Sequence, residues 1–448
     1  MKPKSISYLV LLVILSTGCS EDRRSDPSKL SVWITHNDEE REVFEEVCRD
    51  FEKGHLAETG QTVQIETYRV PFDGLLPKLR TVAASRRAPD ICRVDVAHVV
   101  PMAYGQAILP LNEIDGFPAA SVEAARKTYV PAAVDSCLFA LPGEEPKLWG
   151  VPEQTNTVVL FYNRAHFRGK AERLRQLGCD PERAPRTWEE FSRYCEALTD
   201  PETGRYGFAM ELKLWWSMAF LNTFAAPFVQ FSETTGFRCA LSDPTTIQAL
   251  EYMVSLYQDP ITVNGIKTRR EAGAWQSGAV QKDQGFMNGQ YSMIFTGPWR
   301  LKTFEDAGLD FGVSTIPEGP AGSSSNVGGQ NMVVFRSCPN PPLALKFLLY
   351  LGSRPVQIKW ASRLGQIPVR PDVFDLVDVT KQPRLRTFFD QMLTARARPT
   401  IPRYDRLEEI VNVEIEQAVK GEKSVKSALE DACQRVDHEM FGDHQTSP

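Results

Sequence analysis

The sequence predicts an α/β fold built on a doubly wound sheet, because the first part of the chain contains three successive strand–helix units. They occupy residues 29–53, 61–84 and 89–105. In each unit, a short run with β-branched or aromatic residues precedes a segment whose apolar residues recur at helical spacing. Parallel strands with helical crossovers bind their ligands at the carboxyl ends of the strands. We therefore expect a binding site near residues 36–38 and 94–96, where the first and third strands end.

Strand and helix patterns continue to alternate along the rest of the chain. Residues 187–200 begin with a Thr-x-x-Glu capping box and have a helical pattern. A strand at 291–295 leads into a Gly-Pro pair, and after two further strand patterns a helix is expected at 342–351. The chain closes in a polar helical region, and we expect the tail at 442–448 to fray.

The first residues have the pattern of an export signal. Lys2 and Lys4 precede an apolar run at 9–15, which is too short to span a bilayer. Small residues then lead to Cys19. A cysteine at this point resembles a bacterial lipobox, in which the thiol is lipidated and residues 1–18 are removed. The resemblance implies a protein that is tethered to a membrane through Cys19.

One position departs from the lipobox pattern, because Ser16 occupies the place of the usual leucine, three residues before Cys19. The alternative is an ordinary cleaved signal, which leaves the protein untethered. Residues 19–29 are polar and lack apolar periodicity, as expected of a flexible tether. Both interpretations place the folded body outside the cytoplasm, in the periplasm or at the cell surface.

Length and charge restrict the class of protein. About 420 residues follow the tether, which is enough for two lobes of ordinary size. No later segment approaches the uninterrupted apolar length of a membrane-spanning helix. The formal charge is −6, and removal of Lys2 and Lys4 makes it −8, with 49 basic residues against 57 acidic ones. This balance disfavours a nucleic-acid partner, and we expect a monomer.

The cysteines do not indicate a metal site. Eight remain when Cys19 is set aside, and none forms a CxxC motif or has zinc-type spacing, so we expect neither a metal nor another cofactor. In an oxidising compartment some can be paired, while others can be buried free thiols. Eight cysteines allow on the order of a hundred pairings, and the sequence does not choose among them.

Enzyme signatures are also missing from the sequence. It contains no HExxH helix, no GxSxG elbow and no Walker loop, and its six histidines are scattered. A glycosidase needs only two carboxylates that flank one bond, a geometry that sequence spacing does not exclude. We nevertheless expect a binding protein and not an enzyme.

Seven blocks of sequence, in a fixed order over nearly the whole mature chain, carry a family resemblance. They are PDICRVD (89–95), LWGVPEQTNTVVLFYN (148–163), RTWEEF (186–191), GFMNGQYSMIFTGPW (285–299), FGVSTIPEGPAGSSSNVGGQN (311–331), RLGQIPVRPDV (363–373) and GEKSVKSALEDA (421–432). Together they resemble the extracellular solute-binding lipoproteins of ABC importers, in the branch that binds maltodextrins and multiple sugars.

The resemblance implies a two-lobed periplasmic-binding-protein fold with discontinuous lobes and a hinge between them. We expect the first lobe at 30–140 plus 330–385 and the second at 141–329 plus 386–441. A ligand that touches both lobes favours the closed state, so binding closes the cleft like a clamp. The implied partners are a small carbohydrate, from a mono- to a trisaccharide, and an ABC permease in the membrane. A binding protein that signals to a membrane sensor is the alternative.

Three residues are the first candidates for ligand contact. Trp299 follows Gly-Pro at a strand end, where its ring can stack on a sugar or pack in a core. Asp95 ends the third strand, where its carboxylate can accept hydrogen bonds from hydroxyls or cap the next helix. Asn156 occupies a position at which the family's maltodextrin binders carry a ligand-contacting carboxylate.

Further candidates are polar or aromatic residues near the expected strand ends and crossings. They are His36, Asn37, Glu153, Gln154, Trp216, Gly329, Gln330 and Tyr404. His36 and Asn37 can equally be turn residues, and Gly329 and Gln330 can equally belong to a hinge turn. Trp216 is favoured over its neighbour Trp215, since at most one of an adjacent pair should face the cleft.

The sequence departs from the maltodextrin binders where they carry aromatic rings, at Val94, Glu408 and Glu409. Fewer rings favour a shorter sugar. A polyol, a glycerophosphodiester or a polyamine are the alternative solutes. An anionic solute would require cations in the cleft, for which Arg93, Arg300 and Arg403 are possible sources.

Overall fold

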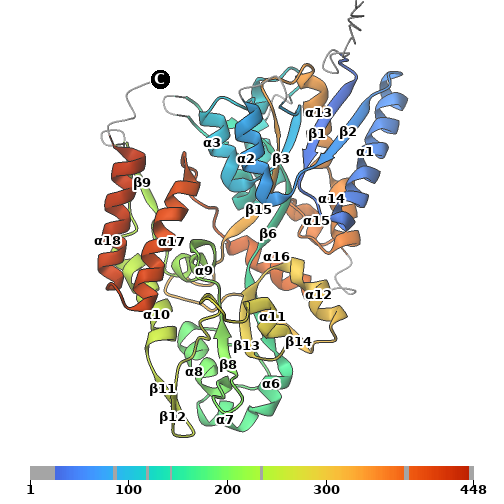
Figure 1. Cartoon of the computed structure of the whole chain (residues 1–448). Coiled ribbons are helices and arrows are strands. Elements are labelled where there is room, and N and C mark those ends of the chain that lie inside the picture. Colours follow the sequence, from blue (N-terminus) through green and yellow to red (C-terminus); the bar gives the residue numbers. More distant parts are fainter. Residues whose placement is uncertain are drawn as a thin grey trace, which may run out of the picture.

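A computed structural model of the chain describes residues 26–83, 88–117, 121–141, 144–232, 236–377 and 383–442. The predicted signal peptide, Cys19 and nearly all of the predicted tail lie outside the described residues. Figure 1 shows two bodies of mixed helices and strands, the upper one around β1, β2 and β3 and the lower one around β8, β13 and β14. We call them the first and the second lobe.

The first lobe contains a five-stranded sheet in the order β2-β1-β3-β15-β6. Its strands are β1 (Lys29–Ile34), β2 (Gln64–Arg69), β3 (Ile91–Asp95), β6 (Val151–Thr157) and β15 (Val327–Val334). β1 is parallel to β2 and β3, whereas β15 is antiparallel to both β3 and β6. The parallel strands alternate with helices, so the three predicted strand–helix units are confirmed.

The helices of the first lobe cover its sheet. They are α1 (Asp38–Thr59), α2 (Phe72–Ala83), α3 (Val99–Tyr104), α4 (Ser121–Thr128), α5 (Pro131–Asp135), α13 (Pro341–Leu351), α14 (Arg354–Leu364) and α15 (Pro371–Phe374). Asn37 and Glu40 form a reciprocal capping box at the start of α1, in which the Glu40 amide donates to Asn37 Oδ1 (2.8 Å) and the Asn37 amide to Glu40 Oε2 (3.0 Å). The box fixes the end of β1 to the first turn of α1.

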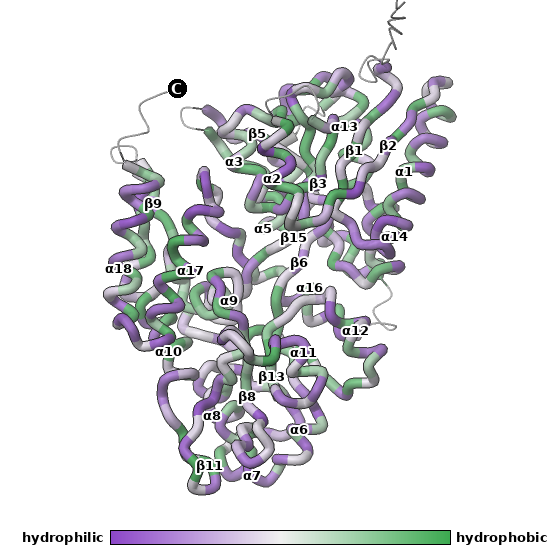
Figure 2. The backbone as a smooth tube through the Cα atoms, in the orientation of Figure 1, coloured by the Kyte–Doolittle hydropathy of each residue, from purple (hydrophilic) through white to green (hydrophobic). Residues whose placement is uncertain are grey.

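The second lobe contains a four-stranded sheet in the order β14-β7-β13-β8. Its strands are β7 (Val159–Asn163), β8 (Tyr206–Ala209), β13 (Tyr291–Thr296) and β14 (Phe311–Ser314). Every residue of β13 is buried, because helices pack on both faces of the sheet. Figure 2 shows apolar segments at β13 and α9, and more polar segments along α17 and α18 at the surface.

The second lobe is rich in helices, as the sequence predicts. They are α6 (Arg164–Gly169), α7 (Ala171–Gln176), α8 (Trp188–Leu198), α9 (Leu214–Thr223), α10 (Pro244–Gln258), α11 (Lys282–Met287), α12 (Leu301–Asp306), α16 (Leu385–Thr394), α17 (Tyr404–Lys420) and α18 (Val425–Val436). Four short strands form two hairpins, β9 (Val229–Ser232) with β10 (Gly236–Cys239) and β11 (Ile261–Val263) with β12 (Ile266–Thr268). β4 (Leu138–Phe139) and β5 (Lys147–Leu148) pair within the first lobe.

Three segments of chain connect the lobes. β6 continues through Val158 into β7, and β15 enters the first sheet at Val327. The third segment lies beside β15, where the Val327 amide donates to the Arg396 carbonyl (2.9 Å) and the Arg396 amide to the Ser325 carbonyl (2.8 Å). β6 pairs within the first sheet, although residues 151–157 lie in the range expected for the second lobe, because the strand completes the sheet before the chain crosses.

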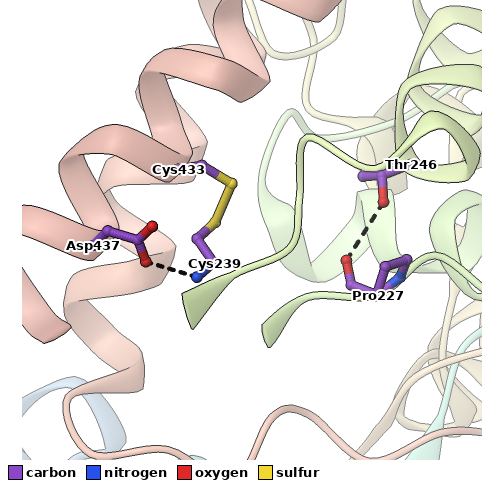
Figure 3. Close-up of a disulfide and its surroundings, with 5 residues drawn as sticks. All are labelled: Pro227, Cys239, Thr246, Cys433 and Asp437. Carbon is purple, nitrogen blue, oxygen red and sulfur yellow. Dashed lines mark hydrogen bonds between the residues drawn. A yellow bond between two sulfur atoms is a disulfide. The ribbon is translucent and has the colours of Figure 1, made fainter. Parts of the chain in front are cut away.

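One disulfide, Cys239–Cys433, joins β10 to α18 (Figure 3). The Cys239 amide also donates to Asp437 Oδ1 (2.7 Å), so the hairpin is held to the C-terminal helix at two points. The other cysteines of the described residues are buried free thiols at positions 48, 92, 137, 179, 195 and 338. The described cysteines therefore include both a pair and buried free thiols, the two outcomes that the sequence left open. A disulfide is typical of proteins from an oxidising compartment.

No helix in the described part of the chain has the length and apolar character needed to cross a membrane.

Candidate functional site

A cavity of about 550 Å³ opens between the two lobes. Its first-lobe wall comes from the start of α1 and the loop after α14, its floor from β6, and its second-lobe wall from the 3-10 turn Pro298–Arg300 and α12. We call it the interlobe cavity. Its volume lies in the range of small-molecule sites. Four of the predicted contact residues line it: Asn37, Gln154, Asn156 and Trp299.

Trp299 supplies the aromatic ring among the residues that line the interlobe cavity. It follows β13 and Gly297, and its ring lies so close to Gly297 that a Cβ at this position would overlap it. The next residue is anchored, because Arg300 Nε donates to the buried Asp283 Oδ2 (2.9 Å). The ring is 46% exposed, which fits a stacking surface and not a core residue.

Asn156 and Asn37 supply amides to the same cavity. The Asn156 side chain forms no hydrogen bond with any described residue, so both its donor and its acceptor are available. Its amide packs over Gly328 on β15, where a Cβ would collide with it. Asn37 Oδ1 already accepts the Glu40 amide as the cap of α1. Asn37 is therefore both a turn residue and part of the cavity lining.

A buried network of polar side chains supports the cavity from the first lobe. His36 Nε2 lies 3.0 Å from Glu153 Oε1, and Arg93 Nε donates to Glu153 Oε2 (2.9 Å). Arg93 also binds Thr35 Oγ1 (2.7 Å) and Gln154 Oε1. The network ties the end of β1 to β3 and β6, and it ends at Gln154 in the cavity lining. His36 and Glu153, predicted as ligand contacts, are buried in this network and do not line the cavity.

The network determines the charge of its members. Burial raises the pKa of Glu153, but the Arg93 guanidinium and the His36 ring more than offset this and bring the pKa to about 2. Burial lowers the pKa of His36, and Arg93 adds to this effect. At neutral pH Glu153 is therefore a carboxylate paired with the Arg93 guanidinium. The His36 ring is harder to protonate than an ordinary histidine.

Asp95 performs the capping role that the sequence left open. Its Oδ1 accepts the Ala97 amide (2.9 Å) at the start of the turn Val96–His98, and it also pairs with the guanidinium of Arg398. Arg398 belongs to the third crossing segment and lies 5.5 Å from the ring centroid of Tyr404. Tyr404 is only 1% exposed, so it packs in the core of the second lobe and does not reach the cavity.

The remaining predicted residues lie beneath the surface. Trp216 is 8% exposed, its Nε1 donates to Glu211 Oε2 (3.2 Å), and Lys282 Nζ lies 4.0 Å from its ring centroid. Gln330 is buried on β15, in register between Asp95 and Gln154. Gly329 packs against the backbone of Gln154 on β6. Gly329 and Gln330 lie within strand β15 and not in a turn, and Trp216 belongs to the second-lobe core.

Several charged residues of the cavity were missed from the sequence. They are Glu39, Glu40, Glu42, Lys302, Glu305, Asp306, Arg363 and Arg384. They lie on exposed turns of α1 and α12 and near the ends of α14 and α16, where charged residues are the normal composition of a helix surface, so no local signal distinguishes them. Among the described residues, no group of three or more His, Cys, Asp or Glu side chains is placed to hold a metal ion.

Residues 46–387 match the family described as bacterial extracellular solute-binding protein. The chain belongs to this family. The resemblance seen in the seven sequence blocks is thereby confirmed, and the family is a solute-binding one.

This solute-binding protein is similar to curated relatives over most of its length. A maltooligosaccharide ABC transporter solute-binding lipoprotein of Streptococcus pneumoniae is 22% identical, covering 96% of this chain and 93% of the relative. The sn-glycerol-3-phosphate-binding periplasmic protein of Shigella flexneri is 23% identical and covers 83% and 84%. The crystal structure of the cyclic α-maltosyl-1,6-maltose binding protein from Arthrobacter globiformis superposes with a TM-score of 0.73, at 24% identity and over 92% and 99% of the two chains. The two-lobed α/β fold is thus confirmed.

Proposed function

We propose that this solute-binding protein captures a small carbohydrate in the interlobe cavity and delivers it to an ABC permease. The observation that carries the proposal is that the exposed Trp299 ring and the unpartnered amide of Asn156 line the same cavity. The apolar C–H face of a sugar stacks on such a ring, while an amide donates to one hydroxyl and accepts from another. The maltooligosaccharide-binding relative supports the same class of solute.

Closure of the cleft follows from where the contacts lie. Asn37 belongs to the first lobe and Trp299 to the second, so a sugar that touches both has more contacts when the lobes approach. We assign residues 30–157 and 327–385 to the first lobe and residues 158–326 and 386–441 to the second, and we infer that the three crossing segments form the hinge. Attachment through a lipidated Cys19 would keep the loaded protein close to its permease.

An anionic solute is the second candidate, because one relative binds sn-glycerol 3-phosphate and the cavity contains three cations. Each of these cations already faces a carboxylate: Lys302 pairs with Asp306 (2.9 Å), Arg363 with Glu46 (3.2 Å) and Arg384 with Glu305 (2.8 Å). Glu39 and Glu42 add further negative charge to the lining. The lining therefore disfavours a phosphate, and we infer a neutral solute.

Thermal unfolding in the presence of candidate solutes tests the proposed function. Glucose, maltose, maltotriose, glycerol, glycerol 3-phosphate and spermidine are each added to the purified protein at 1 mM. A sugar bound with micromolar affinity stabilises the folded state by about 4 kcal/mol at this concentration, which raises the unfolding temperature by several degrees. We expect at least one sugar to do so. A rise with glycerol 3-phosphate or spermidine and with none of the sugars would contradict the carbohydrate assignment.

A further inference from the structure

Lys282 is a buried lysine at the start of α11, in the second lobe, and it is only 1% exposed. Its Nζ donates to Asp283 Oδ1 (2.7 Å) and lies 3.8 Å from Glu211 Oε1. The same ammonium lies 4.0 Å from the ring centroid of Trp216. Burial of an ammonium costs free energy unless its charge has partners, and these three groups are its partners.

The carboxylate of Asp283 joins this lysine to the turn that carries Trp299. Its Oδ1 accepts Lys282 Nζ, and its Oδ2 accepts Arg300 Nε (2.9 Å). Asp283 is 5% exposed, and a carboxylate bound at both oxygens cannot rotate without breaking a charge-assisted hydrogen bond. Arg300, a possible partner of an anionic solute by sequence, is therefore engaged within the protein and does not line the interlobe cavity.

The turn Pro298–Arg300 gives the Trp299 ring little freedom. Pro298 fixes one backbone angle, and the Arg300 amide donates to the Gly297 carbonyl (3.1 Å). The Trp299 ring fills the space beside Gly297, where a Cβ would overlap it. At the other end of the turn, the Arg300 side chain is bound to α11. Packing at one end and this ion pair at the other therefore hold the ring.

We propose that Asp283 is a positioning residue of the interlobe cavity: through Arg300, it sets the orientation in which Trp299 meets a sugar ring. The inference rests on the proposed function and adds to it a residue that does not touch the solute. Lys282 holds the carboxylate from the protein interior. Stacking depends on the angle between the two rings, so a turn that is free to move has a lower affinity although Trp299 is still present.

Calorimetric titration with the sugar that gives the largest thermal shift tests the proposal. Arg300→Met removes the guanidinium, keeps most of the aliphatic stem and should weaken binding about fivefold. Arg300→Lys should restore part of the loss, because an ammonium can still pair with Asp283.

Arg183→Met is the matched control. The Arg183 guanidinium pairs with Glu190 in the same lobe (2.7 and 2.8 Å), and its side chain is 29% exposed, compared with 35% for Arg300. Arg183 does not line the interlobe cavity. The control variant should therefore lose an ion pair of similar exposure and keep the affinity of the unaltered protein.

A double-mutant cycle distinguishes positioning of the ring from an effect elsewhere. If Arg300 acts through Trp299, Arg300→Met should have almost no further effect in the Trp299→Ala background. Asp283→Asn should likewise weaken binding in the unaltered protein and not in the Trp299→Ala protein. A loss of affinity by the same factor in both backgrounds would overturn the inference.

The outcomes separate this inference from the proposed function. Circular dichroism and the unfolding temperature without sugar show which variants are folded, and the Arg300 variants carry the test if Asp283→Asn fails to fold. Equal affinities of the unaltered protein and Arg300→Met would overturn the inference and leave the proposed function standing. Absence of binding of glucose, maltose and maltotriose to the unaltered protein would overturn both.

Discussion

Replacement of Glu153 by Ala is expected to lower the free energy of unfolding by about 3–5 kcal/mol, because it leaves a buried guanidinium without its counter-charge. Arg93 is 3% exposed and gives its Nε to Glu153 (2.9 Å), and His36 Nε2 loses its only partner in the same change. The loss is larger than that of a surface pair because water cannot reach the isolated charge. Urea unfolding of the purified protein at pH 7 measures it.

A control for this variant is Glu189→Ala on α8. Glu189 also pairs with an arginine, Arg193 (2.7 Å), but its side chain is highly exposed. Exposed pairs contribute about 0–1 kcal/mol, so this variant should be close to the unaltered protein. Equal stabilities of the two variants would show that the His36–Glu153–Arg93 network does not support the first lobe.

Replacement of Trp299 by Ala is expected to weaken carbohydrate binding by roughly 30- to 150-fold, which corresponds to about 2–3 kcal/mol of stacking and apolar contact. The unfolding temperature without sugar should change little, because the ring is 46% exposed and lies outside the core clusters. Calorimetric titration with the sugar that gives the largest thermal shift measures the affinity.

Phe231→Ala is the matched control for Trp299. This ring is also exposed, on the hairpin that the disulfide holds to α18, and it does not line the interlobe cavity. Its removal should leave the affinity unchanged. If Trp299→Ala bound the sugar as tightly as Phe231→Ala does, the Trp299 ring would have no part in binding.

Local patterns were sufficient for most of the fold. The strand before the Gly-Pro pair is present as β13, and the helix expected at 342–351 is present as α13. The capping box expected at 187–190 is only half formed: Thr187 Oγ1 accepts the Glu190 amide (3.2 Å), but the Glu190 carboxylate binds Arg183 instead (2.7 and 2.8 Å). Arg183 takes the Glu190 carboxylate away from the capping box. The motif at 187–190 does not reveal that this arginine lies close to Glu190.

The candidate site was less predictable, because its deciding contacts join distant parts of the chain. Trp299 and Asn156 were found from strand ends and from the family pattern. The pairing of Asp95 with Arg398, across 303 residues, and of His36 with Glu153, across 117, has no local signal. The disulfide likewise joins residues 194 positions apart.

The sequence also could not predict which of Trp215 and Trp216 is the more exposed. α9 is buried over almost its whole circumference, so the spacing of its apolar residues does not identify an outward face. What distinguishes the partly exposed Trp215 from Trp216 is its position next to Gly328 and Arg398, which lie on other segments. A single sequence contains no periodicity that reports such contacts.

Small-angle X-ray scattering with and without sugar tests the central claim most directly, since capture in the interlobe cavity requires the two lobes to approach. With saturating maltotriose, or the sugar that gives the largest thermal shift, the radius of gyration should decrease, and Trp299→Ala should require a higher sugar concentration for the same decrease. A sugar that stabilises the protein and leaves the scattering unchanged would place its binding outside the cleft and contradict the account.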